Sequence, residues 1–119
     1  MNLWCICIVV TRDKARYEES TNLAITLAKI DREKSYRIAD IGCGTGAQAM
    51  SLANTLKGDI IAVELFEEFL EKLKENSAKE NTTANIKTLS ASMDKLPFEK
   101  EELDIIWSEG AVYNIGFKN

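Results

Sequence analysis

The chain has 119 residues, 45% of them hydrophobic and 29% charged, and a formal net charge of -4, as expected for one soluble globular domain. The acidic balance argues against nucleic acid and anionic membranes as partners, because surfaces that bind them cluster Lys and Arg. Histidine is absent, which excludes Ser-His catalysis, Cys-His catalysis and His-ligated zinc.

Residues 1–10 form an apolar stretch that is too short to span a bilayer, which requires about 20 residues. The stretch lacks the basic region and the cleavage site of a signal peptide, so we interpret it as a strand or a packed N-terminal segment. Cys5, Cys7 and Cys43 have no zinc-type spacing, and an odd number of cysteines does not make a disulfide framework. We therefore expect reduced thiols and a cytoplasmic location.

Residues 12–20 are polar and are predicted to connect this segment to a helix that begins near Ser20 or Thr21, either of which suits an N-cap. The helix is predicted to bury one apolar stripe with helical spacing, made of Leu23, Leu27 and Ile30. Residues 31–36 are predicted to form a charged loop.

Four short apolar segments bounded by turn residues are predicted as buried strands: 37–41, 59–64, 85–90 and 103–107. Between the first three we predict two helices, over residues 47–56 and 66–79. Their apolar faces comprise Ala49, Leu52, Ala53 and Leu56 in the first helix and Phe66, Phe69, Leu70 and Leu73 in the second. Lys57-Gly58 is predicted to stop the first helix, because glycine takes the left-handed conformation past a helix end. The alternation predicts an α/β fold with a doubly wound parallel sheet, whose ligands bind outside the carboxyl ends of the strands.

The strongest motif is Ile-Ala-Asp-Ile-Gly-Cys-Gly-Thr-Gly at residues 38–46, between a predicted strand and a predicted helix. Gly42, Gly44 and Gly46 let the backbone turn sharply and let a ligand approach without meeting a Cβ atom. The first amide N–H groups of the following helix point into the same space. We interpret the segment as a cofactor-binding turn.

The same glycines also fit the dinucleotide pattern Gly42-x-Gly44-x-x-Ala47, with Glu64 at a suitable distance to contact a ribose. The loop alone therefore leaves two kinds of cofactor open, a nicotinamide or flavin dinucleotide and S-adenosyl-L-methionine. Asp40 favours the second, because no Lys or Arg in the loop would offset its carboxylate beside a pyrophosphate. The same carboxylate favours the sulfonium and ammonium of S-adenosylmethionine.

Residues 40–46, Asp-Ile-Gly-Cys-Gly-Thr-Gly, resemble motif I of the class I S-adenosylmethionine-dependent methyltransferases, and the resemblance extends over residues 38–117. It implies a Rossmann-like fold, S-adenosyl-L-methionine as cofactor and a small-molecule methyl acceptor. Glu64 would then bind both ribose hydroxyls, Asp94 would accept from the adenine amino group, and Met93 and Leu65 would flank the ring. The implied cofactor-binding set is Asp40, Gly42, Cys43, Gly44, Gly46, Glu64, Leu65, Met93, Asp94 and Ser108.

Residues 94–117 further resemble small-molecule methyltransferases related to the ubiquinone and menaquinone methylating enzymes. In such enzymes residues 108–114 would lie near the methionine end of the cofactor and the methyl acceptor. Positioning the acceptor is the main contribution of the protein, and a base is needed only where the acceptor loses a proton. Glu109 and Tyr113 are the candidates for that base, and neither is assigned as catalytic.

Compared with the complete sheet of this family, the chain is expected to supply only four strands, in the order 3-2-1-4. We therefore expect residues 1–36 to form an N-terminal segment and helix, and residues 37–119 a methyltransferase domain that is truncated at its C-terminus and inactive in isolation. The fourth strand would be an exposed edge carrying Ile105, Ile106 and Trp107, which invites self-association. Two alternatives stay open, a nicotinamide-dependent oxidoreductase fragment and a non-catalytic methyltransferase-like binding module.

Overall fold

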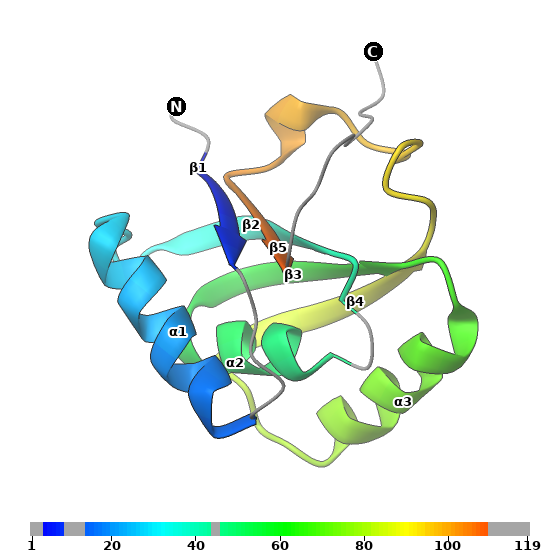
Figure 1. Cartoon of the computed structure of the whole chain (residues 1–119), viewed down its shortest axis with the longest axis horizontal. Coiled ribbons are helices and arrows are strands. Elements are labelled where there is room, and N and C mark those ends of the chain that lie inside the picture. The colour runs from blue at the N-terminus through cyan, green and yellow to red at the C-terminus, as the bar shows by residue number, and fades with distance from the viewer. Residues whose placement is uncertain (1–3, 9–13, 44–45, 110–119) are drawn as a thin grey trace.

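A single parallel sheet forms the centre of the molecule (Figure 1). The computed structural model describes residues 4–8, 14–43 and 46–109. The sheet has the strand order β1-β5-β2-β3-β4, and every neighbouring pair is parallel. The strands are β1 (Trp4–Ile8), β2 (Ser35–Ile41), β3 (Lys57–Glu64), β4 (Ala84–Ser90) and β5 (Ile105–Glu109).

The two faces of the sheet are covered differently (Figure 1). The helices α1 (Lys14–Leu27), α2 (Ala47–Thr55) and α3 (Glu67–Ala78) all lie on one face. The other face is covered by the segment between β4 and β5, which contains the short helix η1 (Lys100–Glu102). Leu96, Phe98 and Leu103 of this segment pack on that face with Ala39 and Ile106 of the strands.

The predicted order of the four strands is confirmed, since β4-β3-β2-β5 is the order 3-2-1-4 of the sequence prediction. The prediction that the fourth strand, β5, forms an exposed edge is wrong. The N-terminal strand β1 pairs with β5 in parallel, from Trp4 opposite Ile105 to Ile8 opposite Glu109. The sheet therefore gains a fifth strand, and the ladder groups that would have been open for self-association are paired within the chain.

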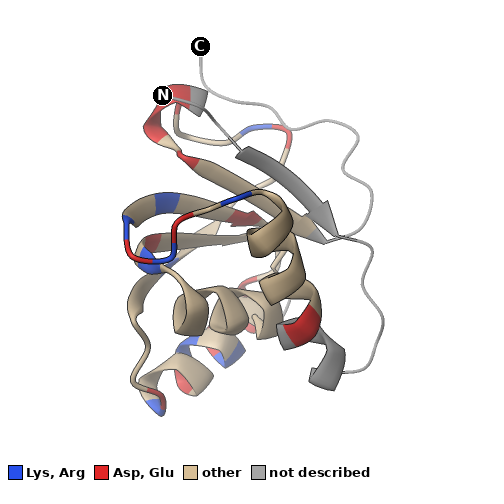
Figure 2. Cartoon of the chain, turned by 90° about the vertical axis from the view of Figure 1, so that its left-hand side faces the viewer, with Lys and Arg blue, Asp and Glu red and all other residues tan. Residues whose placement is uncertain are grey.

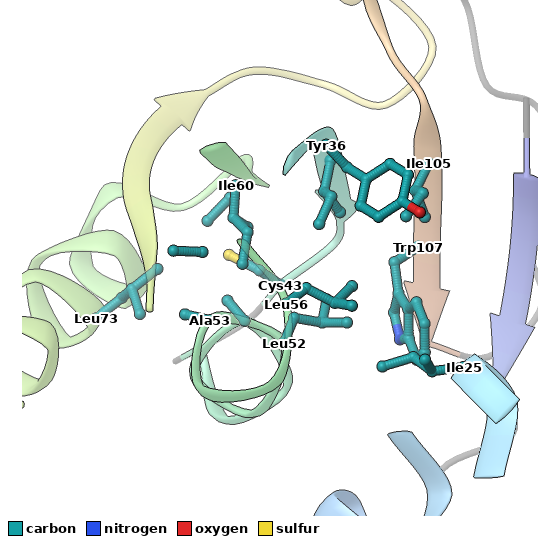
Figure 3. Close-up of a cluster of buried hydrophobic side chains, with 14 of the residues drawn as sticks. Ile25, Tyr36, Cys43, Leu52, Ala53, Leu56, Ile60, Leu73, Ile105 and Trp107 are labelled. Carbon is teal, nitrogen blue, oxygen red and sulfur yellow. The ribbon is translucent and has the colours of Figure 1, made fainter. Parts of the chain in front are cut away.

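Strand β2 separates two buried layers because its side chains alternate between the two faces. Tyr36 and Ile38 join the layer under the helices, and Ala39 and Ile41 join the opposite layer. The helix-side layer is the larger one. Its best-buried members include Ile25, Leu52, Leu56, Ile60, Leu73, Ile105 and Trp107 (Figure 3).

Helix α1 differs from its prediction in both start and orientation. It begins at Lys14 rather than near Ser20 or Thr21, because the preceding residues, Lys-Ala-Arg-Tyr-Glu-Glu, are mostly good helix formers. The predicted stripe is also wrong for two of its three members, since Leu23 and Leu27 are 59% and 73% exposed. The buried side follows Thr21 and Ile25, one helical turn apart, with Ala24 and Ala28 partly buried beside them.

Helix α2 buries the predicted residues Ala49, Leu52, Ala53 and Leu56 completely. In α3 only part of the predicted stripe is buried: Leu70 and Leu73 face the core, whereas Phe66 and Phe69 are exposed. The two phenyl rings pack edge to face with their centroids 5.8 Å apart. They cover each other's apolar surface outside the core.

Gly58 does not stop α2, as the sequence suggested. The helix ends with Leu56 in an extended conformation, and Gly58 lies inside β3 with φ 108°. A Cβ atom at this position would lie 2.1 Å from the backbone oxygen of Tyr36 on β2. Glycine is required because the two backbones approach closely at the start of both strands.

Residues of both charges are interspersed along the described helices, strands and loops (Figure 2). The Lys57 ammonium and the Glu33 carboxylate, for example, form an exposed ion pair at 2.8 Å. Exposed pairs of this kind contribute little to stability. A more buried carboxylate, that of Asp104, accepts the backbone N–H of Arg37 at 2.9 Å and holds the start of β5 against β2.

We predict that Gly58→Ala destabilises the chain by about 3 kcal/mol or more, because the substitution adds both an unfavourable positive φ and a backbone clash. Urea unfolding monitored by circular dichroism measures the change. Lys57→Ala is the matched control and should cost less than about 1 kcal/mol. Equal stability of Gly58→Ala and the wild type would contradict the close approach of β2 and β3.

Candidate functional site

The glycine turn bends over the end of β3. The backbone N–H groups of Gly42 and Cys43 both donate to the carbonyl oxygen of Val63, at 2.9 and 3.0 Å. Gly42 has φ 70°, in the region that favours glycine. Directly after β2, the chain is thus held beside the carboxyl end of the neighbouring strand, where parallel sheets bind ligands.

Gly46 ends the turn and begins α2 as its N-cap, with φ 92°. Its N–H donates to the carbonyl of Cys43 at 3.0 Å, and its carbonyl accepts from Met50 at 2.9 Å. A Cβ atom on Gly46 would lie 2.2 Å from Cδ1 of Leu73 on α3. The absence of a side chain therefore lets α2 start directly against α3.

An open pocket of about 110 Å³ lies at the carboxyl ends of β3 and β4, next to the glycine turn. Seven of the described residues line it: Gly42, Val63, Glu64, Leu65, Ala91, Ser92 and Met93. They come from the ends of three adjacent strands and the loops that follow them. Four of the predicted cofactor-binding residues, Gly42, Glu64, Leu65 and Met93, are thus brought together.

Glu64 is the ionisable residue among the described residues that line this pocket. It is the last residue of β3, and its Oε2 accepts the backbone N–H of Leu65 at 3.1 Å. The Glu64 carbonyl accepts from Ala91 at 3.2 Å, which joins the ends of β3 and β4. A half-buried carboxylate has a further oxygen available to accept from a ligand hydroxyl.

Leu65 and Met93 supply apolar surface to the pocket. Their side chains are 55% and 38% exposed, although both are large and hydrophobic. Exposed apolar side chains gathered in one concave site are typical of a ligand pocket. The flat ring of a nucleobase would cover this surface.

Asp94 lies next to the pocket lining rather than in it. Its Oδ1 accepts from the hydroxyl of Ser92, so the loop after β4 carries its own side-chain hydrogen bond. Ala91 and Ser92 line the pocket and were not among the predicted site residues. Their small size just after a predicted strand was the only indication in the sequence.

Asp40 and Cys43 lie behind the turn, in the core. Asp40 is fully buried, with Ala62 and Trp107 as its register neighbours. Cys43 is 4% exposed and lies within the layer under the helices. The Cys43 backbone is engaged by Val63 and Gly46, so this residue shapes the turn.

Ser108 ends up beside Ile41, near the carboxyl end of β5. Its side chain is 3% exposed, and within residues 4–8, 14–43 and 46–109 its hydroxyl has no hydrogen-bond partner. Gly44, Tyr113 and the side chain of Glu109 lie outside the described residues. Their predicted roles stay predictions.

The described residues lack the features of two other kinds of site. They contain no group of three or more Cys, Asp or Glu that is suited to hold a metal ion. No helix in the same part of the chain has the length and apolar character to cross a membrane.

The chain belongs to the family of methyltransferase domains, whose model matches residues 38–118. Among curated relatives, the glycine/sarcosine/dimethylglycine N-methyltransferase of Actinopolyspora halophila is 27% identical over 88 residues, which are 74% of this chain and 16% of that protein. The sarcosine/dimethylglycine N-methyltransferase of Aphanothece halophytica is 24% identical over 116 residues, or 93% of this chain and 41% of that protein. The chain thus spans less than half of either relative.

Solved structures show the same fold. A SAM-dependent methyltransferase from Aquifex aeolicus superposes with a TM-score of 0.58 at 18% identity, over 82% of this chain and 57% of that one. A phosphoethanolamine N-methyltransferase from Haemonchus contortus, solved with phosphoethanolamine and S-adenosylhomocysteine, gives 0.57 at 22% identity, over 76% of this chain and 20% of that one. The family match favours a methyltransferase over the nicotinamide-dependent alternative.

We predict that alanine at the two ends of the glycine turn has different effects. Gly42→Ala should cost only about 1–2 kcal/mol of stability, because the one described atom within 4 Å of its Cβ would be Cε of Met93, at 3.9 Å. The same Cβ would enter the pocket and weaken S-adenosylhomocysteine binding by about tenfold or more. Gly46→Ala should cost more stability, since its Cβ would clash with Leu73.

Thermal unfolding and isothermal titration calorimetry measure these two effects separately. Comparable losses of stability in both variants, with unchanged affinity in Gly42→Ala, would contradict the placement of the pocket beside Gly42.

Proposed function

We propose that this chain binds S-adenosyl-L-methionine in the pocket beside the glycine turn and that the protein transfers its methyl group to a small-molecule acceptor. One observation carries the proposal. A carboxylate at the end of β3, Glu64, shares a pocket with a glycine turn on one side and exposed Leu65 and Met93 on the others. The carboxylate suits a ribose, the glycine turn leaves room for a ligand that approaches the protein backbone closely, and the apolar side chains suit an adenine ring.

The residues present fit this cofactor. Glu64 would accept from the vicinal hydroxyls of the ribose, because the two oxygens of a carboxylate suit a diol. Leu65 and Met93 would cover the faces of adenine, and Asp94, next to the pocket, would accept from its amino group. Gly42 would leave room for the methionine end, and the carboxylate of Asp40, buried behind the turn, would favour its positive charge.

The reaction asks little acid-base chemistry of the protein. S-adenosylmethionine supplies a methyl group already activated by its sulfonium. The chain contributes a fixed position for the cofactor, and orientation of this kind can account for a large part of a rate enhancement. The absence of histidine agrees with such a mechanism, because a neutral acceptor that attacks through its lone pair needs no strong base.

A small amine is the first acceptor class to assay. Two curated relatives are named as N-methyltransferases of sarcosine and dimethylglycine, and one of them also of glycine. A solved neighbour is named as a phosphoethanolamine N-methyltransferase. These names support a small polar amine over a macromolecular acceptor.

We predict that Glu64→Gln weakens S-adenosylhomocysteine binding by about tenfold, because the loss of one charged acceptor costs about 1.5 kcal/mol. Calorimetric titration of the purified chain measures the dissociation constant. Glu67→Gln is the matched control, since Glu67 is exposed in the first turn of α3 and lies outside the pocket. Its affinity should equal that of the wild type.

The same titration with NADH tests the choice of cofactor. The wild-type chain should prefer S-adenosylhomocysteine, because neither Lys nor Arg is among the described residues that line the pocket and could neutralise a pyrophosphate. Tighter binding of NADH, or an unchanged S-adenosylhomocysteine affinity in Glu64→Gln, would refute the proposed function.

A further inference from the structure

A buried pair of polar side chains links α1 to the start of α2. Nε2 of Gln48, in the first turn of α2, donates a hydrogen bond to Oγ1 of Thr21 on α1. Both residues are fully buried, at 0% exposure. Gln48 lies two residues after Gly46, where the glycine turn ends.

At its carboxyl end, α2 is held by Thr83, whose hydroxyl donates to the carbonyls of Ala53 and Leu56. Toward its amino end, the buried side chains other than Gln48 and Ser51 are apolar and give little axial definition. Ala49, Leu52 and Ala53 are held by the hydrophobic effect, which is non-directional. A side-chain hydrogen bond is directional, because it requires a short distance and near-linear geometry. The bond between Gln48 and Thr21 therefore sets how far along its axis the amino end of α2 sits relative to α1.

Gln48 is poorly explained by stability alone. Its Oε1 is buried without a hydrogen-bond partner in the part of the chain that the structure describes. Burying an unsatisfied amide oxygen is unfavourable. A leucine in place of Gln48, with an apolar residue in place of Thr21, would pack here without that cost. Local departures of this kind from a well-packed core are expected where a residue serves the site.

We propose that Gln48 is a positioning residue of the cofactor site. Its bond to Thr21 fixes the amino end of α2, and with it Gly46 and the glycine turn, against the end of β3. The inference rests on the proposed function, because it concerns the S-adenosylmethionine pocket described above. Neither Gln48 nor Thr21 lines that pocket, so both act through the turn.

The test is a double-mutant cycle with Gln48→Leu, Thr21→Val and the double variant. Each single variant removes one member of the buried hydrogen-bonded pair and should lower both Tm and S-adenosylhomocysteine affinity. The double variant replaces both partners by apolar groups, so its Tm should recover toward that of the wild type. Its affinity should stay about tenfold weaker, which corresponds to 1.4 kcal/mol, because the axial restraint is gone.

Two further variants separate positioning from stability. Thr21→Ser keeps the hydroxyl and should keep the affinity of the wild type. Ile25→Val removes a buried methylene from the same helix without touching the pair, so it should lower Tm but leave affinity unchanged.

The outcomes distinguish this inference from the proposed function. If the wild-type chain does not bind S-adenosylhomocysteine, both the proposed function and this inference are refuted. If the wild type binds but the double variant binds equally well, only the inference is overturned. The same holds if Ile25→Val weakens binding as much as Thr21→Val does, and this comparison stands even where Gln48→Leu fails to fold.

Discussion

The carbonyl oxygen of Val63 determines where the functional site can form. It accepts the N–H groups of both Gly42 and Cys43, so the chain leaving β2 is bent over the end of β3 instead of running on past the sheet. The bend needs a residue that tolerates φ 70°, and Gly42 supplies it. Everything that makes the pocket follows from this contact, because it brings the turn beside Glu64 and Leu65.

The parallel sheet extends this arrangement to the neighbouring strands. Pairing of Glu64 with Ser90 aligns the ends of β3 and β4, so the loops that follow them emerge side by side. Leu65 from one loop and Met93 from the other then enclose the same space. A pocket made of residues from distant parts of the sequence is thus a consequence of strand register rather than of any single motif.

The sequence predicted the structure best where a single segment determines its own conformation and buried face. The residues from Ile38 to Gly46 predicted a strand, a turn and a helix start, and the buried face of α2 followed from its apolar spacing. Prediction failed where contacts between distant segments determine the structure. Nothing local indicated that β1 would cover the edge of β5, because that pairing joins segments about one hundred residues apart.

Helix α1 shows the same limit at the level of side chains. Leu23 and Leu27 have helical spacing, yet the buried side carries Thr21 and Ile25. Thr21 is buried because Gln48 on α2 bonds to its hydroxyl, and no pattern within α1 encodes that partner. Gly58 likewise has the left-handed φ expected of a helix stop, but it is required by the backbone of Tyr36 on another strand.

The most direct test of this account is a map of backbone amide shifts in an ¹⁵N-labelled chain titrated with S-adenosylhomocysteine. The largest changes should fall on Gly42, Leu65 and residues 91–93, which meet only at the carboxyl ends of the strands. Changes centred on Arg37, Asp59 and Lys87, which line a different pocket, would place the ligand elsewhere and contradict the central claim.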